Sequence, residues 1–357
     1  MSAAADEKKV FATMAPAIGL VGVAAALHFT EAGSIFNFVG SALALASVAH
    51  VIGEATDQLG NHLSPAATGI VQSAVGNLPE LFVCIFALRA GLLTVVQASL
   101  IGSILSNALL VLGLAFIAGG RRHGVLHFEN QTPRMIATLL LLAVSALVLP
   151  TLAQELHLPS GAHEQKLAVV CAIVLLFVFV VLTRAMLSQG ARTLPAETHA
   201  RLHAWSLGAA VGVLVACGAA AVFISDWFVD ALGPAIETLG ISEAFSGLVV
   251  VAIAGNAVEN VVGIRLAAQG KADLAVSVIL NSALQVAVAL IPILVLVSFA
   301  MGDAAPFTLA IPPILAASLF LSVLVVTVVT VDGRADMVDG AALAGLYVIV
   351  ASIFWWG

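Results

Sequence analysis

Charged residues are scarce in this sequence. Lysine, arginine, aspartate and glutamate make up 9% of its 357 residues, whereas an ordinary soluble domain carries about a quarter. Hydrophobic residues make up 61%, and the mean hydropathy is +1.13. This composition excludes a soluble globular protein and predicts an integral membrane protein with the lipid bilayer as its surroundings.

Basic residues and cysteines are also few. The net charge is -7 and the 13 Lys and Arg are scattered in short segments, so there is no basic stripe to bind a nucleic acid. Cys84, Cys171 and Cys217 lie far apart within apolar runs. We expect them to be buried helix residues and neither a disulfide framework nor a metal cluster.

Long apolar runs predict an all-α polytopic membrane protein. Taking about 20 apolar residues per span, we expect eleven transmembrane helices, near 11–29, 35–52, 66–89, 95–119, 133–154, 167–187, 204–224, 244–268, 274–300, 307–331 and 340–357. They group as 1 + 5 + 5. The expected parts are a tail and leading helix (1–34), a first five-helix repeat (35–187), a cytoplasmic linker (188–203) and a second five-helix repeat (204–357).

The grouping rests on an acidic phrase that occurs twice. Gly76-Asn77-Leu78-Pro79-Glu80 and Gly255-Asn256-Ala257-Val258-Glu259 share Gly, Asn and Glu at an offset of 179 residues, and the register continues to Ser103 and Ser282. Because five helices is an odd number, the second set crosses the membrane in the opposite sense. The sequence therefore predicts an inverted-topology repeat.

Lysine and arginine are distributed unevenly between alternate loops, and this predicts the orientation. With the N-terminus inside, the outer side holds only Arg89 and Lys166. The inner side holds Lys8, Lys9, Arg121, Arg122, Arg134, Arg184, Arg192, Arg201, Arg265, Lys271 and Arg334. We expect a cytoplasmic N-terminus and an outward C-terminus, in what we take to be a bacterial inner (plasma) membrane.

The doubled glutamates are the candidate functional residues, because a carboxylate at membrane depth costs roughly 2.5 to 3.5 kcal/mol on insertion scales. Residues three and four apart share a helix face, so each half offers a polar stripe facing the bundle interior or a wet cavity. The candidate ligands are Asn77, Glu80, Asn256 and Glu259, with Ser103, Ser282 and Gln285 from the helices that follow. Ser73 and Asn260 extend the two stripes, whereas Ser99, whose repeat partner is Val278, is assigned to packing.

Every one of these candidate ligands can present an oxygen. Calcium takes 6 to 8 oxygen ligands, whereas zinc or copper(I) prefers thiolate or imidazole. Two carboxylates in an empty site repel each other, so protons compete with the cation. A transporter that reorients when the site holds either the cation or protons, but not when both carboxylates are charged and empty, is an exchanger. Both glutamates would then couple cation transport to protons.

A helix break at each acidic phrase would add carbonyl ligands. Both phrases begin with Gly, and Pro79 removes a helix hydrogen bond in the first. The second has Val258 at that position, so a break there would depend on Gly255 alone.

The two segments 76–120 and 255–296 resemble the α-repeats of calcium/proton antiporters, the CAX branch of the cation/calcium exchanger superfamily. The segment Ile52 to Leu59 (IGEATDQL) is similar to the one preceding the family's first repeat. The resemblance implies a secondary transporter and not an enzyme: Ca2+ leaves and H+ enters by alternating access, with Glu80 and Glu259 as central ligands. The transported ions are its only implied ligands, with no cofactor. The chain departs from the family at Asn260, where a His is common, and at Asn281, where a Gly is common.

Three alternatives remain open from the residues. Sodium is a possible counter-ion, because a hard oxygen site can also hold sodium. A cation channel would use similar oxygens, but more often as rings at a multimer axis. An intramembrane hydrolase could use two acids as a dyad, but it would not require a matching repeat around each.

Further acidic residues lie near the expected membrane surfaces. Glu54 and Asp57 are near the inner mouth, and Asp226 and Asp230 are near the outer one. They form either acidic vestibules that concentrate cations or solvated helix ends.

Overall fold

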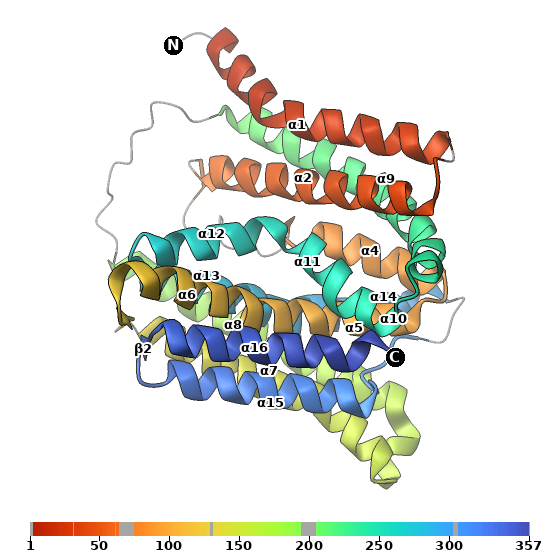
Figure 1. Ribbon diagram of the computed structural model, residues 1–357, viewed down its shortest axis with the longest axis vertical. Coiled ribbons are helices and arrows are strands. Elements are labelled where there is room, and N and C mark those ends of the chain that lie inside the picture. Colours follow the sequence, from red (N-terminus) through yellow and green to blue (C-terminus); the bar gives the residue numbers. More distant parts are fainter. Residues whose placement is uncertain are drawn as a thin grey trace. The chain divides into compact units, whose positions relative to one another are not determined.

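The computed structural model describes residues 3–30, 32–60, 62–63, 75–128, 131–193, 205–302 and 306–356. Nearly all of these residues are helical (Figure 1). The longer helices are α1 (Ala3–Phe29), α2 (Ser34–Gly60), α4 (Leu78–Arg89), α5 (Leu93–Leu105), α6 (Leu112–His123), α7 (Gln131–Glu155), α8 (Glu164–Thr193), α9 (Leu207–Leu239), α12 (Ala257–Ala268), α13 (Ala272–Gln285), α14 (Ile291–Met301), α15 (Pro313–Thr330) and α16 (Met337–Trp355). The short helices are the 3-10 turn η2 (Pro159–His163), α10 (Glu243–Phe245) and α11 (Ala252–Gly255).

Three segments are wider π-helices that continue an α-helix without interrupting it. They are η1 (Ser106–Val111), η4 (Ser246–Val251) and η5 (Val286–Leu290). Nothing in the apolar pattern predicts them, because hydrophobic periodicity does not distinguish a local π-turn from an α-turn. Such turns are rare and often occur at functional sites.

Within the described residues, nine helices are long and apolar enough to span a membrane. A bent pair, 243–255 with 260–268, makes a tenth if it is counted as one span. The remaining predicted span, 66–89, is described only from residue 75 onward. The predicted end of the 204–224 helix was wrong, because α9 continues to Leu239 and ends at Gly240, whose φ is +63°. Asp226 and Asp230 do not end this helix because both side chains are exposed.

The helix boundaries themselves recur at the 179-residue offset. Helix α4 (78–89) corresponds to α12 (257–268), and α5 followed by η1 and α6 corresponds to α13 followed by η5 and α14. Gly91 and Gly270, which precede α5 and α13, have the same φ of +77°. Phe128 and Phe307 also lie at this offset, and both are fully buried. The repeat therefore extends from sequence identity to local backbone structure.

The chain divides into two compact units. One unit comprises residues 1–86 and 179–240. Its α2 packs mainly against α9 and also against α1 (Figure 1), and Phe38 of α2 stacks on Phe228 of α9 with ring centroids 5.0 Å apart.

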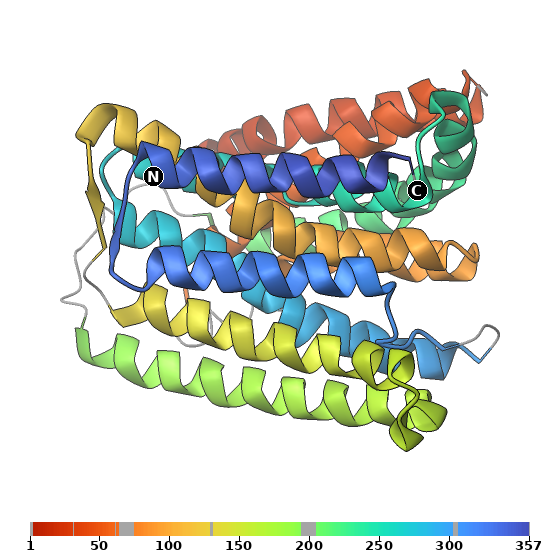
Figure 2. The same cartoon turned by 60° about the horizontal axis from the view of Figure 1, so that its bottom comes forward.

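The other unit comprises residues 87–178 and 241–357. Here α16 packs on α6, α15 packs on α7, and α12 contacts both α6 and α13 (Figure 2). A two-stranded antiparallel sheet, β1 (Leu126–His127) with β2 (Arg334–Ala335), joins the α6–α7 connection to the α15–α16 connection. These four residues are the exception to the predicted all-α fold within the described chain.

Glycines set two close helix crossings in this second unit. A Cβ atom on Gly102 of α5 would lie 2.2 Å from the carbonyl oxygen of Leu248 in η4. A Cβ atom on Gly113 of α6 would lie 2.7 Å from the carbonyl oxygen of Gly340 in α16. Small residues of this kind allow backbones to approach closely in membrane proteins.

The connection between α14 and α15 has no helix or strand over residues 306–312 and is held by side chains from other helices. Gln97 of α5 donates a hydrogen bond to the carbonyl oxygen of Ala310 at 3.1 Å. The hydroxyl of Thr151 in α7 accepts a hydrogen bond from the Ile311 amide at 3.1 Å. These bonds give polar partners to backbone groups of the connection, and the Ile311 amide also donates to the carbonyl oxygen of Leu309 at 3.1 Å.

Candidate functional site

Both acidic phrases lie at helix breaks, as their glycines predicted. In the first, residues 76–77 form a turn and α4 begins at Leu78. In the second, α11 ends at Gly255 and α12 begins at Ala257, with a bend of 64° between the two arms. Equivalent backbone hydrogen bonds follow the two breaks. The amide of Leu81 donates to the carbonyl oxygen of Asn77, and the amide of Asn260 donates to that of Asn256, each at 3.0 Å. The second break forms without a proline.

Each break places its glutamate at the third position of the new helix. Glu80 is half-buried in α4, and the backbone of Glu259 occupies the equivalent position in α12. The side chain of Glu259 lies outside the described part of the structure, as does Ser73. The N-terminal turn of a helix favours a negative charge, so both positions suit an ionised carboxylate.

Four buried polar residues from both repeats meet in the second unit. They are Ser103 of α5, Asn107 of η1, Asn256 at the break and Ser282 of α13, and none is more than 7% exposed. The amide nitrogen of Asn256 donates to the Ser103 hydroxyl, and it also donates to the carbonyl oxygen of Ala252 at 3.0 Å. This set of four residues is called the amide–hydroxyl cluster below.

Asn107 connects the residues that the two repeats contribute to the amide–hydroxyl cluster. Its amide nitrogen lies 3.3 Å from the side-chain oxygen of Asn256, 3.4 Å from the Ser282 hydroxyl and 3.0 Å from the carbonyl oxygen of Ser103. Within the described part of the chain its side-chain oxygen is buried and makes no hydrogen bond. An amide oxygen of this kind is a suitable ligand for a hard cation.

The sequence argument missed Asn107 because it selected doubled positions, and the repeat partner of Asn107 is Val286. A different signal was present. Asn107 follows Ser103 by four residues and therefore shares its helix face, and it is a polar amide inside a highly apolar run. A search for polar residues one turn from the doubled serines would have found it.

The other predicted ligands have the following positions. Asn77 is buried at the first break and belongs, with Glu80, to the first unit. Gln285 is half-buried at the end of α13, three residues after Ser282 and on the same face. Ser99, which was assigned to packing, donates to the carbonyl oxygen of Val96 in its own helix at 3.0 Å.

The four vestibule candidates differ in environment. Glu54 is half-buried and accepts a hydrogen bond from Gln58 at 3.0 Å. Asp57, Asp226 and Asp230 are exposed. These positions are compatible with either a vestibule or a solvated helix surface.

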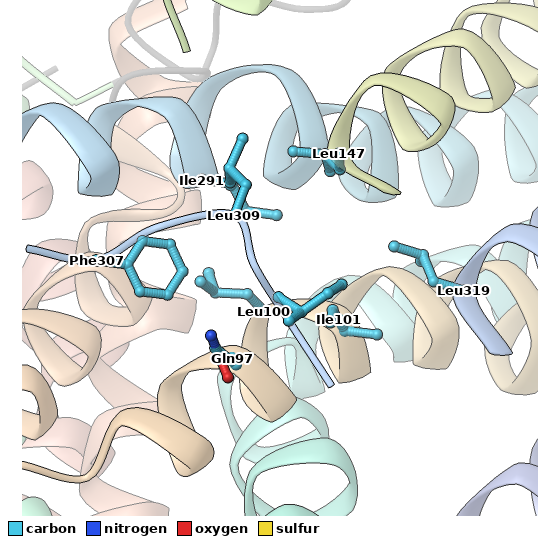
Figure 3. A pocket seen from close by; sticks show the side chains of 9 residues that line it. Gln97, Leu100, Ile101, Leu147, Ile291, Phe307, Leu309 and Leu319 are labelled. Carbon is cyan, nitrogen blue, oxygen red and sulfur yellow. The ribbon is translucent and has the colours of Figure 1, made fainter. Parts of the chain in front are cut away.

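A pocket beside the 306–312 connection does not resemble a cation site. Its walls are apolar and include Leu100, Ile101, Leu147 and Phe307, and Gln97 is the one polar side chain among its lining residues (Figure 3). Gln97 supplies the one side-chain oxygen among these lining residues, so the pocket offers few oxygen ligands. The amide–hydroxyl cluster, and not this pocket, has the chemistry for a hard cation.

Replacing Asn107 by leucine should weaken cation binding strongly. The substitution keeps a similar volume but removes the free amide oxygen and the nitrogen that contacts Asn256 and Ser282. We expect the dissociation constant for a hard cation such as Ca2+, measured on the purified protein, to rise about tenfold or more, equivalent to ~1.4 kcal/mol, with little change in protein yield. Ser145→Ala is the control, because among the described residues the hydroxyl of Ser145 bonds within α7, to the carbonyl oxygen of Leu141. Equal effects of both variants would contradict the assignment.

The long apolar helices define an integral membrane protein. Its distinguishing features are a helix break that occurs in both repeats and the buried, oxygen-rich amide–hydroxyl cluster. The family model described as sodium/calcium exchanger protein matches residues 33–187 and 209–356. The chain belongs to this family.

Relatives match along nearly the full chain. A Ca2+/H+ antiporter from Synechocystis sp. is 31% identical over 350 residues, covering 92% of this chain and 93% of the relative. The Ca2+/H+ antiporter ChaA from Bacillus subtilis is 31% identical, covering 96% of this chain and 97% of the relative. The solved structure of native YfkE is 28% identical with a TM-score of 0.80, covering 96% of this chain and 99% of that one. These matches confirm the resemblance that the two repeats predicted.

Proposed function

We propose that this protein is a secondary transporter that exchanges Ca2+, or a similar hard divalent cation, for H+ by alternating access. The observation that carries the proposal is the amide–hydroxyl cluster, which joins oxygen-bearing side chains of both repeats at a helix break. The printed names of the relatives, Ca2+/H+ antiporters, support the same choice of ions. A transporter also accounts for the doubled polar positions better than an enzyme does.

The proposed cation ligands are Glu80 and Glu259 with Asn77, Asn256, Ser103, Ser282 and Gln285. To this set we add Asn107, because its buried side-chain oxygen makes no hydrogen bond within the described residues. The two carboxylates neutralise a divalent charge in a medium of low dielectric constant, where an unpaired charge is costly. The same two groups take up protons when the cation leaves, which couples the two fluxes.

The proposed topology has eleven spans arranged as 1 + 5 + 5 with an inverted repeat. Nine helices, the bent pair and the predicted span 66–89 together make eleven. Recurrence of the helix boundaries at the 179-residue offset supports two homologous sets of five. We place the N-terminus in the cytoplasm and the C-terminus outside a bacterial inner membrane, because the basic residues are concentrated in alternate loops.

Calcium uptake into proteoliposomes tests the proposed function. Purified protein is reconstituted, and uptake of radioactive calcium is driven by a proton gradient or by a sodium gradient in turn. We expect saturable uptake with the proton gradient, abolished by a protonophore. Uptake driven by sodium alone would instead identify a sodium/calcium exchanger, and flux that does not saturate or respond to a counter-gradient would indicate a channel.

A further inference from the structure

Two further buried hydroxyl groups, outside the amide–hydroxyl cluster, belong to Tyr347 and Ser106. Tyr347 of α16, the single tyrosine of the chain, is 4% exposed, and Ser106, the first residue of η1, is 0% exposed. Helix α16 contacts η1, and the two hydroxyl groups lie near each other at this contact. Within the described residues neither oxygen makes a hydrogen bond.

The glycine crossing between α6 and α16 sets this pairing. The backbone of Gly113 faces Gly340, and further along α6 the backbone of Gly120 faces Met337. Contacts therefore move backward along α16 as they move forward along α6, so the two helices are antiparallel. Ser106 precedes Gly113 by seven residues and Tyr347 follows Gly340 by seven, so both lie on the same side of the crossing, where α16 contacts η1.

Two buried hydroxyls without partners would be costly, since each loses its hydrogen bonds to water. A small rotation of the Ser106 or Tyr347 hydroxyl, or one shared water molecule, satisfies both groups at little cost. A bond of this kind would link α16 to the first residue of η1. The next residue of η1 is Asn107, whose amide contacts Ser103, Asn256 and Ser282.

We infer that Tyr347 is a positioning residue for cation binding: through Ser106 it fixes the π-helical turn that aims the Asn107 amide at the amide–hydroxyl cluster. The inference rests on the proposed function, because it assigns Tyr347 a role in binding the transported cation. Tyr347 does not contact the cation. Its hydroxyl restricts the rotation of η1, so that Asn107 keeps one orientation when the site is empty.

Removing only the hydroxyl tests this inference. In proteoliposomes with a proton gradient, Tyr347→Phe should raise the KM for calcium about fivefold, in line with the loss of one buried hydrogen bond, while kcat and protein yield stay near wild type. Ser106→Ala should produce the same change. The double variant should be no worse than either single variant, because both remove the same interaction.

The matched control is Ser352→Ala, on the exposed side of the same helix, where the hydroxyl bonds to the carbonyl oxygen of Val348 at 2.7 Å. It should leave the KM unchanged. A wild-type KM for Tyr347→Phe, additive effects in the double variant, or a loss of yield and kcat at constant KM would each overturn the inference. Absence of calcium/proton exchange in the wild-type protein would instead overturn the proposed function, so the two failures are distinguishable.

Discussion

Glu259→Gln is expected to abolish calcium-driven proton exchange while the protein still folds, and Glu80→Gln is expected to do the same. Glutamine keeps the size and one side-chain oxygen but removes the negative charge. A divalent cation then faces a single carboxylate in a medium of low dielectric constant, and one proton-accepting group is lost. We expect exchange to fall at least about 100-fold, consistent with ~2.7 kcal/mol or more of lost stabilisation.

The measurement is calcium uptake into proteoliposomes together with the elution profile and thermal midpoint of each purified variant. Glu237→Gln provides the control, because Glu237 is an exposed acid near the end of α9. It should transport at the wild-type rate. Glu259→Gln or Glu80→Gln protein that folds and still exchanges calcium for protons would refute the two-carboxylate site.

Gly102→Ala should lower both the stability of the protein and its transport rate, although a Gly→Ala substitution within a helix ordinarily stabilises a protein. In a helix interior alanine is favoured over glycine by about 1 kcal/mol. At Gly102, however, the new Cβ atom would lie 2.2 Å from the carbonyl oxygen of Leu248 and 2.5 Å from its Cα atom. Helix α5 must then move away from η4, at a cost typical of overpacking, about 1 to 3 kcal/mol.

This displacement also moves the neighbouring Ser103 away from Asn256, so we expect calcium uptake to fall with the thermal midpoint. Gly345→Ala is the matched control on α16, because a Cβ atom there meets nothing within 4 Å. That variant should be as stable as wild type or slightly more stable. A Gly102→Ala protein with unchanged midpoint and uptake would show that the close approach of α5 and η4 is not required.

The long apolar runs were sufficient to predict the helical membrane fold, and the doubled acidic phrase predicted the offset and a helix break at its first copy. Its prediction for the second break was too cautious, since α11 ends at Gly255 without a proline nearby. The helix breaks at residues 76–77 in the first copy and at Asn256 in the second, so a proline is not required for the second break. Local backbone features at equivalent positions of the two repeats could therefore be predicted from the sequence.

Features that depend on contacts between distant segments could not be predicted in the same way. Asn107 has no counterpart in the second repeat, and its importance becomes visible only when Asn256 and Ser282 are seen beside it. The π-helical turn η1 leaves no mark on apolar periodicity. Helix α9 continued past its predicted end because Asp226 and Asp230 lie on an exposed face, and exposure is a property of the folded chain.

The small sheet of the second unit has a mechanical consequence. Leu126 pairs with Ala335, the amide of Phe128 donates to the carbonyl oxygen of Gly333 at 2.8 Å, and the ring of Phe128 stacks on Phe116 of α6. The ends of α6, α7, α15 and α16 are thereby tied together at one level. We expect these four helices to move together as one rigid group during transport. Relative movement of helices should then occur at contacts that the small sheet does not restrain.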